Sequence, residues 1–149
     1  MSERPVEWAG PIYVDASALV KLFVPEDESD SLNAALSGSS EVVISDLALT
    51  EMASAIGRRR REGVLDAVEA RRLQREAGKL AGACAKVEIT PPVHRHAERL
   101  LLSAILSEPL RTLDALHVAL ALQAQAATFV SYDTRLRRVA ESQGLVVVP

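Results

Sequence analysis

Short, mostly apolar segments alternate along this chain with longer segments of helical composition. The apolar segments are rich in β-branched residues and predict strands at residues 12–14, 42–44, 87–89, 129–130 and 145–148. The segments between them predict helices at residues 16–24, 26–36, 46–62, 66–86, 93–106, 113–126 and 134–142. Strands without polar positions are buried on both faces, as in parallel sheets. We therefore expect a three-layer α/β/α sandwich around a mostly parallel sheet of about five strands.

The length and composition favour one ordinary globular domain. The chain has 149 residues, of which 48% are hydrophobic and 25% are charged. We expect a single domain over residues 1–149, with residues 1–11 as a short polar lead-in. Polar residues interrupt every apolar run before it reaches membrane-spanning length, and the N-terminus has no apolar signal core, so we expect a cytoplasmic protein with no membrane contact. The net charge of -3 argues against binding nucleic acid by bulk charge alone.

Four carboxylates break the apolar pattern. Asp15 and Asp133 each directly follow a predicted strand or its short polar extension, whereas Glu51 and Asp114 lie on helical segments whose neighbours are small or apolar. Asp15 and Asp133 have a simple alternative role as helix N-caps, and Asp114 suits the first turn of a helix. An unpaired buried carboxylate is nevertheless costly.

The predicted topology brings these acids together. In open parallel sheets, functional groups gather beyond the carboxyl ends of the strands, so two strand ends and two helices can converge on one cleft. Clustered acids repel each other unless a cation neutralises them, and Mg²⁺ and Mn²⁺ prefer oxygen ligands. The chain has no pair of cysteines to support a zinc site of the cysteine type. The four acids therefore predict a site for a hard divalent cation.

The same residues lie in segments that resemble a known family. The segments are IYVDASAL at 12–19, the pair TE at 50–51, LRTLDALH at 110–117 and FVSYD at 129–133. In order and spacing they resemble the PIN-domain ribonucleases, in particular the VapC-type toxins of bacterial toxin–antitoxin systems. The resemblance extends over almost the whole chain, from residue 12 to residue 149.

The resemblance implies a PIN-like fold and a Mg²⁺- or Mn²⁺-dependent endonuclease that cleaves RNA. It implies that Asp15, Glu51, Asp114 and Asp133 are the catalytic, metal-binding residues, with Ser17 and Ser131 supporting them. It also implies a homodimer that a small antitoxin protein inhibits. Two metal ions can activate water and stabilise the leaving oxygen. Some relatives have a further acid after the Asp133 position, where this chain has arginines, so we expect a weaker second metal site.

Two other features bear on this site. The predicted helix that carries Glu51 ends in Arg58, Arg59, Arg60 and Arg61. These arginines can simply stabilise the helix C-terminus, or they can contact RNA phosphates or an antitoxin. His117 lies one helical turn after Asp114, and we expect it to be a supporting core residue rather than a metal ligand.

Two alternative functions use similar residues. Receiver domains and related phosphatases also place an aspartate after a strand, but they need further acids or a lysine that this chain lacks at the corresponding positions. A catalytically inert PIN-like module that only binds RNA or protein is the other alternative. The presence of all four acids favours the nuclease over both.

Overall fold

The computed structural model describes residues 6–103 and 109–149. Its helices are α1 (Ala16–Phe23), α2 (Ser29–Ser37), α3 (Asp46–Arg61), α4 (Ala67–Ala83), α5 (Pro91–Leu101), α6 (Thr112–Gln123) and α7 (Thr134–Ser142). Its strands are β1 (Ile12–Val14), β2 (Val42–Ile44), β3 (Ala85–Lys86), β4 (Thr128–Val130) and β5 (Val146–Val148). This alternation confirms the α/β class predicted from the sequence.

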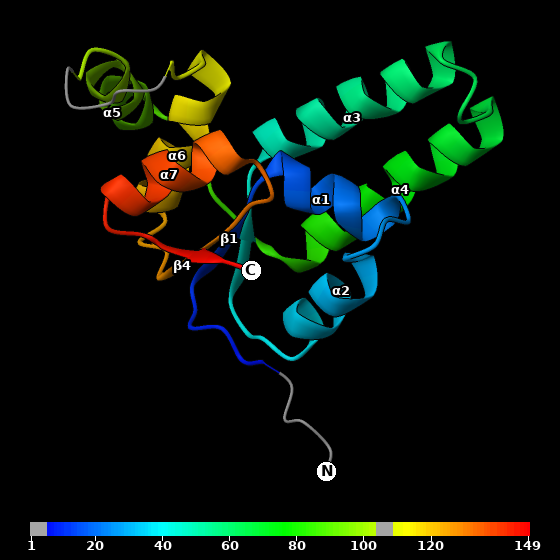
Figure 1. The fold of residues 1–149 in the computed structure, drawn as a ribbon, viewed down its shortest axis with the longest axis horizontal. Helices are drawn as coiled ribbons and strands as arrows, with labels where there is room; N and C mark the ends of the chain where they lie inside the picture. The colour runs from blue at the N-terminus through cyan, green and yellow to red at the C-terminus, as the bar shows by residue number, and fades with distance from the viewer. Residues whose placement is uncertain (1–5, 104–108) are drawn as a thin grey trace.

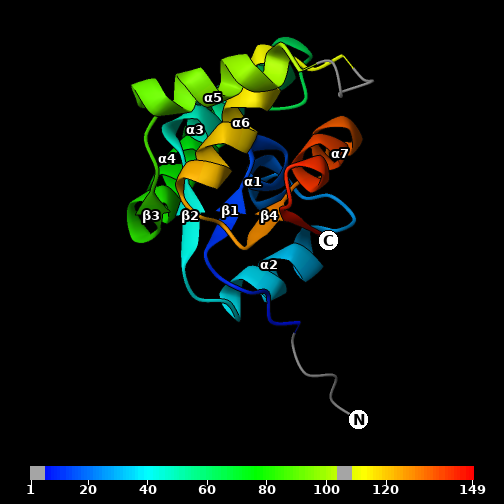
Figure 2. The ribbon, with the colours of Figure 1, turned by 90° about the vertical axis from the view of Figure 1, so that its left-hand side faces the viewer.

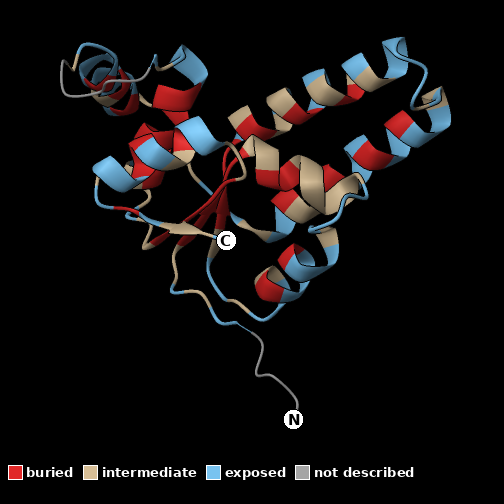
Figure 3. Cartoon of the chain, in the orientation of Figure 1, coloured by how far each residue is buried: buried red, intermediate tan, exposed pale blue. Residues whose placement is uncertain are grey.

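All five strands pair in parallel, in the order β3-β2-β1-β4-β5. Helices α1 to α4 cover one face of this sheet, and α5, α6 and α7 cover the other (Figures 1 and 2). Successive strand residues serve opposite faces: Tyr13 packs with the core under α5 to α7, whereas Ile12 and Val14 pack toward α1 and α2. The strands in the centre are buried (Figure 3). The three-layer α/β/α sandwich is confirmed.

Local sequence signals account for most helix starts. Asp15, Ser45, Asp66 and Asp133 each accept a hydrogen bond from the backbone of the following first turn. Helix α5 begins two residues earlier than predicted, at Pro91, because proline is well suited to the first helical position. The predicted end of this helix, at 104–106, lies outside the described residues.

Two local predictions were wrong. The third strand is Ala85–Lys86 and not 87–89, because α4 already ends at Ala83 and residues 85 and 86 pair with Val43 and Ile44. Helix α6 begins at Thr112, one residue before the predicted start, and Arg111 is its cap. The Asp114 carboxylate accepts a hydrogen bond from the backbone N–H of Arg111 at 3.3 Å and so anchors this helix start.

The strand order has a switch point between β1 and β4. From β1 the chain proceeds outward through β2 to β3, and it later returns to form β4 and β5 on the other side of β1. Ligands of parallel α/β folds bind beyond the carboxyl ends of the strands at such a point. Asp15 directly follows β1 and Ser131 directly follows β4, so both lie there. No helix in the described part of the chain is long and apolar enough to cross a membrane.

Candidate functional site

An open cleft of about 740 Å³ lies at the switch point. Its charged lining residues are the acids Asp15, Glu26, Glu51 and Asp133 and the bases Lys21, Arg58, Arg59 and Arg111. They come from both ends of α1, from the starts of α6 and α7, from the length of α3, and from the segment after α1. The cleft therefore combines carboxylates near the sheet with basic side chains around them.

Both carboxylate oxygens of Asp15 accept short hydrogen bonds. Its Oδ1 accepts from the Ser17 hydroxyl at 2.7 Å and from the Ala18 backbone N–H at 2.9 Å. Its Oδ2 accepts from the Ser131 hydroxyl at 2.5 Å. The serines come from either side of the switch point, and together they fix the Asp15 carboxylate. Asp15 is thus a helix cap, and its carboxylate also reaches the cleft.

Burial makes the Asp15 carboxylate electrostatically unusual. Only 2% of the residue is exposed, and this burial raises its pKa above the ordinary aspartate value. The hydrogen bonds from Ser131 and Ala18 oppose that rise without cancelling it. A buried anion whose donors are hydroxyl and backbone groups favours either a proton or a bound cation.

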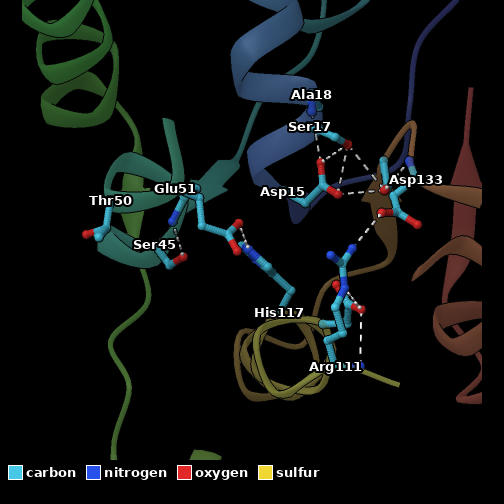
Figure 4. Close-up of polar contacts among 12 residues, drawn as sticks. Asp15, Ser17, Ala18, Ser45, Thr50, Glu51, Arg111, His117 and Asp133 are labelled. Carbon is cyan, nitrogen blue, oxygen red and sulfur yellow. Dashed lines mark hydrogen bonds and ion pairs between the residues drawn. The ribbon is translucent and has the colours of Figure 1, made fainter. Parts of the chain in front are cut away.

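Asp133 is tied to the same serine. Ser131 Oγ, which donates to Asp15, accepts a hydrogen bond from the Asp133 backbone N–H at 3.1 Å. Asp133 Oδ1 accepts from the backbone N–H groups of Arg135 and Leu136, which caps α7. Its other oxygen points toward the Arg111 guanidinium, 3.7 Å from Nη2 (Figure 4). Ser131 therefore links the positions of two of the four acids.

Asp114 is buried at the start of α6, with 7% of the residue exposed, and it is not among the residues that line the cleft. Its Oδ2 contacts Nε of Arg111 at 3.4 Å. The same guanidinium approaches Asp133, so Arg111 lies between these two acids as a positive charge supplied by the protein itself. Such a bridge reduces the repulsion between the acids in the metal-free protein.

Glu51 reaches the cleft from the second turn of α3. Its Oε2 lies 2.8 Å from Nε2 of His117, and the other ring nitrogen of His117 lies 2.7 Å from the Tyr13 hydroxyl. His117 is 2% exposed. This agrees with its predicted role as a supporting core residue.

The structure therefore gathers most, but not all, of the predicted site. Asp15, Ser17, Glu51 and Asp133 line one cleft, and Asp114 reaches it through Arg111. Within residues 6–103 and 109–149, no three acid, histidine or cysteine side chains are close enough to hold a metal ion as they stand. Of the arginine run, Arg58 and Arg59 line the cleft, whereas Arg60 and Arg61 are exposed and are not among its lining residues.

The sequence interpretation missed two contributors, Arg111 and Tyr13. A signal existed for each. Arg111 stands three residues before Asp114, a spacing at which side chains meet at a helix start. A tyrosine in a fully apolar strand must find a partner for its hydroxyl. Lys21, whose ammonium lies 4.5 Å from the centre of the Tyr132 ring, also borders the cleft.

Comparison with known proteins identifies a consistent set of relatives. The family profile described as PIN domain matches residues 12–142. Ribonuclease VapC46 of Mycobacterium tuberculosis is 35% identical over 139 residues, which cover 92% of this chain and 95% of that protein. The crystal structure of M. tuberculosis VapC20, a Sarcin-Ricin loop cleaving toxin, aligns with a TM-score of 0.69 at 17% identity and covers 91% of this chain and 96% of that one. VapBC2 from Rickettsia felis, crystallised with a DNA fragment from its promoter, aligns with a TM-score of 0.64 at 13% identity and covers 92% and 96%.

Proposed function

The chain belongs to the PIN domain family, and on this premise we propose that it is a metal-dependent endoribonuclease, the toxin of a toxin–antitoxin pair. The family resemblance seen in the sequence is thereby confirmed. The observation that carries the proposed activity is the buried Asp15 carboxylate at the switch point, in one cleft with Glu51 and Asp133. The similarity to a protein named as a ribonuclease supports RNA as the substrate.

Mg²⁺ or Mn²⁺ is the proposed cofactor, held by Asp15, Glu51, Asp114 and Asp133. The donor chemistry fits, because every one of these ligands is a carboxylate oxygen and hard cations prefer oxygen. The raised pKa of Asp15 also fits, since a bound cation stabilises a buried carboxylate. The side chains are not drawn together as they stand. Arg111, whose exposed side chain lies between Asp114 and Asp133, supplies the positive charge there that a bound cation would replace.

Different residues of the chain have different roles in the proposed phosphodiester hydrolysis. When bound, the divalent cation activates water and offsets negative charge on the reacting phosphate. Ser17 and Ser131 orient Asp15, and His117 orients Glu51, so that these oxygens are fixed before RNA arrives. Asp133 has one oxygen committed to the cap of α7, which leaves the other to bind metal or to accept a proton from water. Arginines in the cleft bind the substrate phosphates.

The membership in the PIN domain family removes the support for an aspartate-phosphorylated receiver or phosphatase. Its relatives extend the proposal to partners: a small antitoxin that inhibits the enzyme, and assembly as a homodimer. Both proposals rest on similarity to VapC proteins.

Chelation tests the proposed metal dependence directly. We expect cleavage of structured RNA in Mn²⁺ or Mg²⁺, loss of that cleavage in excess EDTA, and recovery when Mn²⁺ is restored. The readout is product formation on a denaturing gel with end-labelled RNA. Cleavage that persists at full rate in EDTA would contradict a metal-dependent mechanism, and a complete lack of cleavage under all metal conditions would favour the inert module.

The two arginines that line the cleft provide a second test. We expect the double variant R58A/R59A to bind RNA more weakly and with less dependence on salt, because each lost phosphate contact reduces the slope of log K against log salt by about 0.7 for single strands. Binding is measured by fluorescence anisotropy in EDTA, which prevents cleavage.

The matched control is R60A/R61A, which removes the same charge from the same helix end but from residues outside the cleft lining. It should keep the wild-type salt slope. Equal slopes in the two double variants would mean that the arginine run only stabilises the helix end or attracts RNA non-specifically.

A further inference from the structure

A chain of buried hydrogen bonds connects Glu51 to the interior of the fold. The Glu51 carboxylate lies 2.8 Å from His117 Nε2, and His117 Nδ1 lies 2.7 Å from the Tyr13 hydroxyl. The Tyr13 hydroxyl in turn lies 3.2 Å from Ser45 Oγ. The chain thus joins α3, α6, β1 and the residue that caps α3. Figure 4 shows His117 directed at the Glu51 carboxylate from the opposite side of the cleft.

The interior part of this chain is closed to water. Ser45, Tyr13 and His117 are each at most 2% exposed. Buried polar groups require partners, and each of these side chains has one on either side. The Tyr13 hydroxyl has one proton to donate and can accept a hydrogen bond from its other neighbour.

With a neutral imidazole, one order of donors satisfies the whole chain. Ser45 donates to the Tyr13 oxygen, Tyr13 donates to His117 Nδ1, and the proton on His117 Nε2 is donated to Glu51. The reverse order would place the lone pair of Nε2 against the Glu51 carboxylate at 2.8 Å, which is repulsive. The Tyr13 hydroxyl thus selects the imidazole tautomer that can donate to Glu51.

We propose that His117 and Tyr13 are positioning residues that hold the Glu51 carboxylate in place for metal binding and RNA cleavage. This inference rests on the proposed function. A glutamate side chain loses rotamer entropy when it is fixed, so a partner that fixes it in advance favours metal binding. The bond to His117 fixes one oxygen in advance and leaves the other free toward the cleft, where the side chain is 24% exposed.

The test compares two substitutions of one histidine. In H117Q the amide nitrogen occupies the place of Nε2 and still donates to Glu51, whereas in H117N the shorter amide does not reach it. Loss of a partner that orients a metal ligand costs about 10–100-fold in metal affinity or activity. We expect H117N to lose that much in Mn²⁺ affinity, measured by electron paramagnetic resonance without RNA, and in RNA cleavage. We expect H117Q to recover most of both.

The control is H94N, the same substitution at an exposed histidine of α5 outside the cleft lining. It should match the wild type in both measurements. Thermal melts in EDTA identify any variant that fails to fold. If H117N does not fold, Y13F takes its place. This substitution removes a single oxygen and keeps the ring stacked on Phe129, and it should also lower the Mn²⁺ affinity.

The position of the proton gives a readout that needs neither metal nor RNA. In a two-bond ¹H–¹⁵N correlation spectrum, His117 of the wild type should carry its proton on Nε2 and have an unprotonated Nδ1. A protonated Nδ1 would overturn the proposed order. Equal cleavage and Mn²⁺ affinity in the wild type, H117N and Y13F would overturn the positioning role and leave the proposed ribonuclease function intact. If the wild type cleaves no RNA, the ribonuclease function fails instead, and Mn²⁺ affinity and proton position still decide whether Glu51 is held in this way.

Discussion

We expect D15N to reduce metal-dependent RNA cleavage by at least about 100-fold, the upper end of the cost of losing even an indirect partner of a metal ligand. Asparagine has nearly the same shape as aspartate and can still accept the hydrogen bond from the Ala18 backbone N–H, so the cap of α1 is kept. The substitution removes the negative charge at the centre of the cleft and turns one oxygen into an N–H donor. Initial cleavage rates over a range of Mn²⁺ concentrations measure the effect.

A matched control separates this loss from a general effect of charge. Asp30 is an exposed aspartate in the first turn of α2, and D30N makes the same chemical change away from the cleft. We expect D30N to cleave RNA at the wild-type rate. If D15N retained that rate as well, Asp15 would be only a helix cap, and the proposed site would be wrong.

The sequence predicted the positions of the acids well because strand ends are simple to recognise. A short β-branched segment followed by an acid, as at Val14 and Asp15, defines both the strand end and the first residue of the loop. Parallel pairing then places all such loops at one edge of the sheet. The order of elements therefore predicts that Asp15, Glu51 and Asp133 lie at the same edge of the sheet, but it does not by itself bring them into one cleft. The strand order that makes β1 and β4 neighbours was not visible in the sequence.

The supporting contacts were not predictable because they join residues far apart in the chain. Tyr13 and His117 are separated by 104 positions, and Ser131 and Asp15 by 116. No periodicity or spacing rule records such a pair. The local sequence pattern also gave the wrong position for β3. Residues 85 and 86 pair with β2, although residues 87–89 are more apolar. In both cases tertiary contacts, and not local preference, decided the structure.

The second large effect that we expect is on stability without metal, where D15N should be more stable than the wild type at pH 8. Burial raises the pKa of Asp15, so the folded state disfavours the ionised carboxylate. The stability associated with protonated Asp15 is fully present below the ordinary aspartate pKa and is lost as the pH rises through the raised value. At pH 8 the wild type has lost this contribution to its stability, whereas asparagine is neutral at every pH and its contribution does not change. Each 1 kcal/mol gained in free energy of unfolding raises Tm by about 2–4 °C for a chain of this size.

The comparison is made by thermal melts of both proteins in EDTA between pH 8 and pH 4. The advantage of D15N should shrink as the pH falls, because Asp15 of the wild type becomes protonated while other acids titrate alike in both proteins. A wild type more stable than D15N at pH 8 would show that the hydrogen bonds from Ser17 and Ser131 outweigh the cost of burial.

Saturating metal should reverse the order of the two proteins. A ligand at 100 times its Kd stabilises the folded state by about 2.7 kcal/mol, so Mn²⁺ should raise the Tm of the wild type by about 5–10 °C. D15N should respond little, because it lacks the buried charge that attracts the cation. If the wild type is less stable than D15N without metal and more stable with it, the buried Asp15 carboxylate destabilises the free protein and stabilises the metal-bound one. An equal Mn²⁺ response in both proteins would place the cation elsewhere.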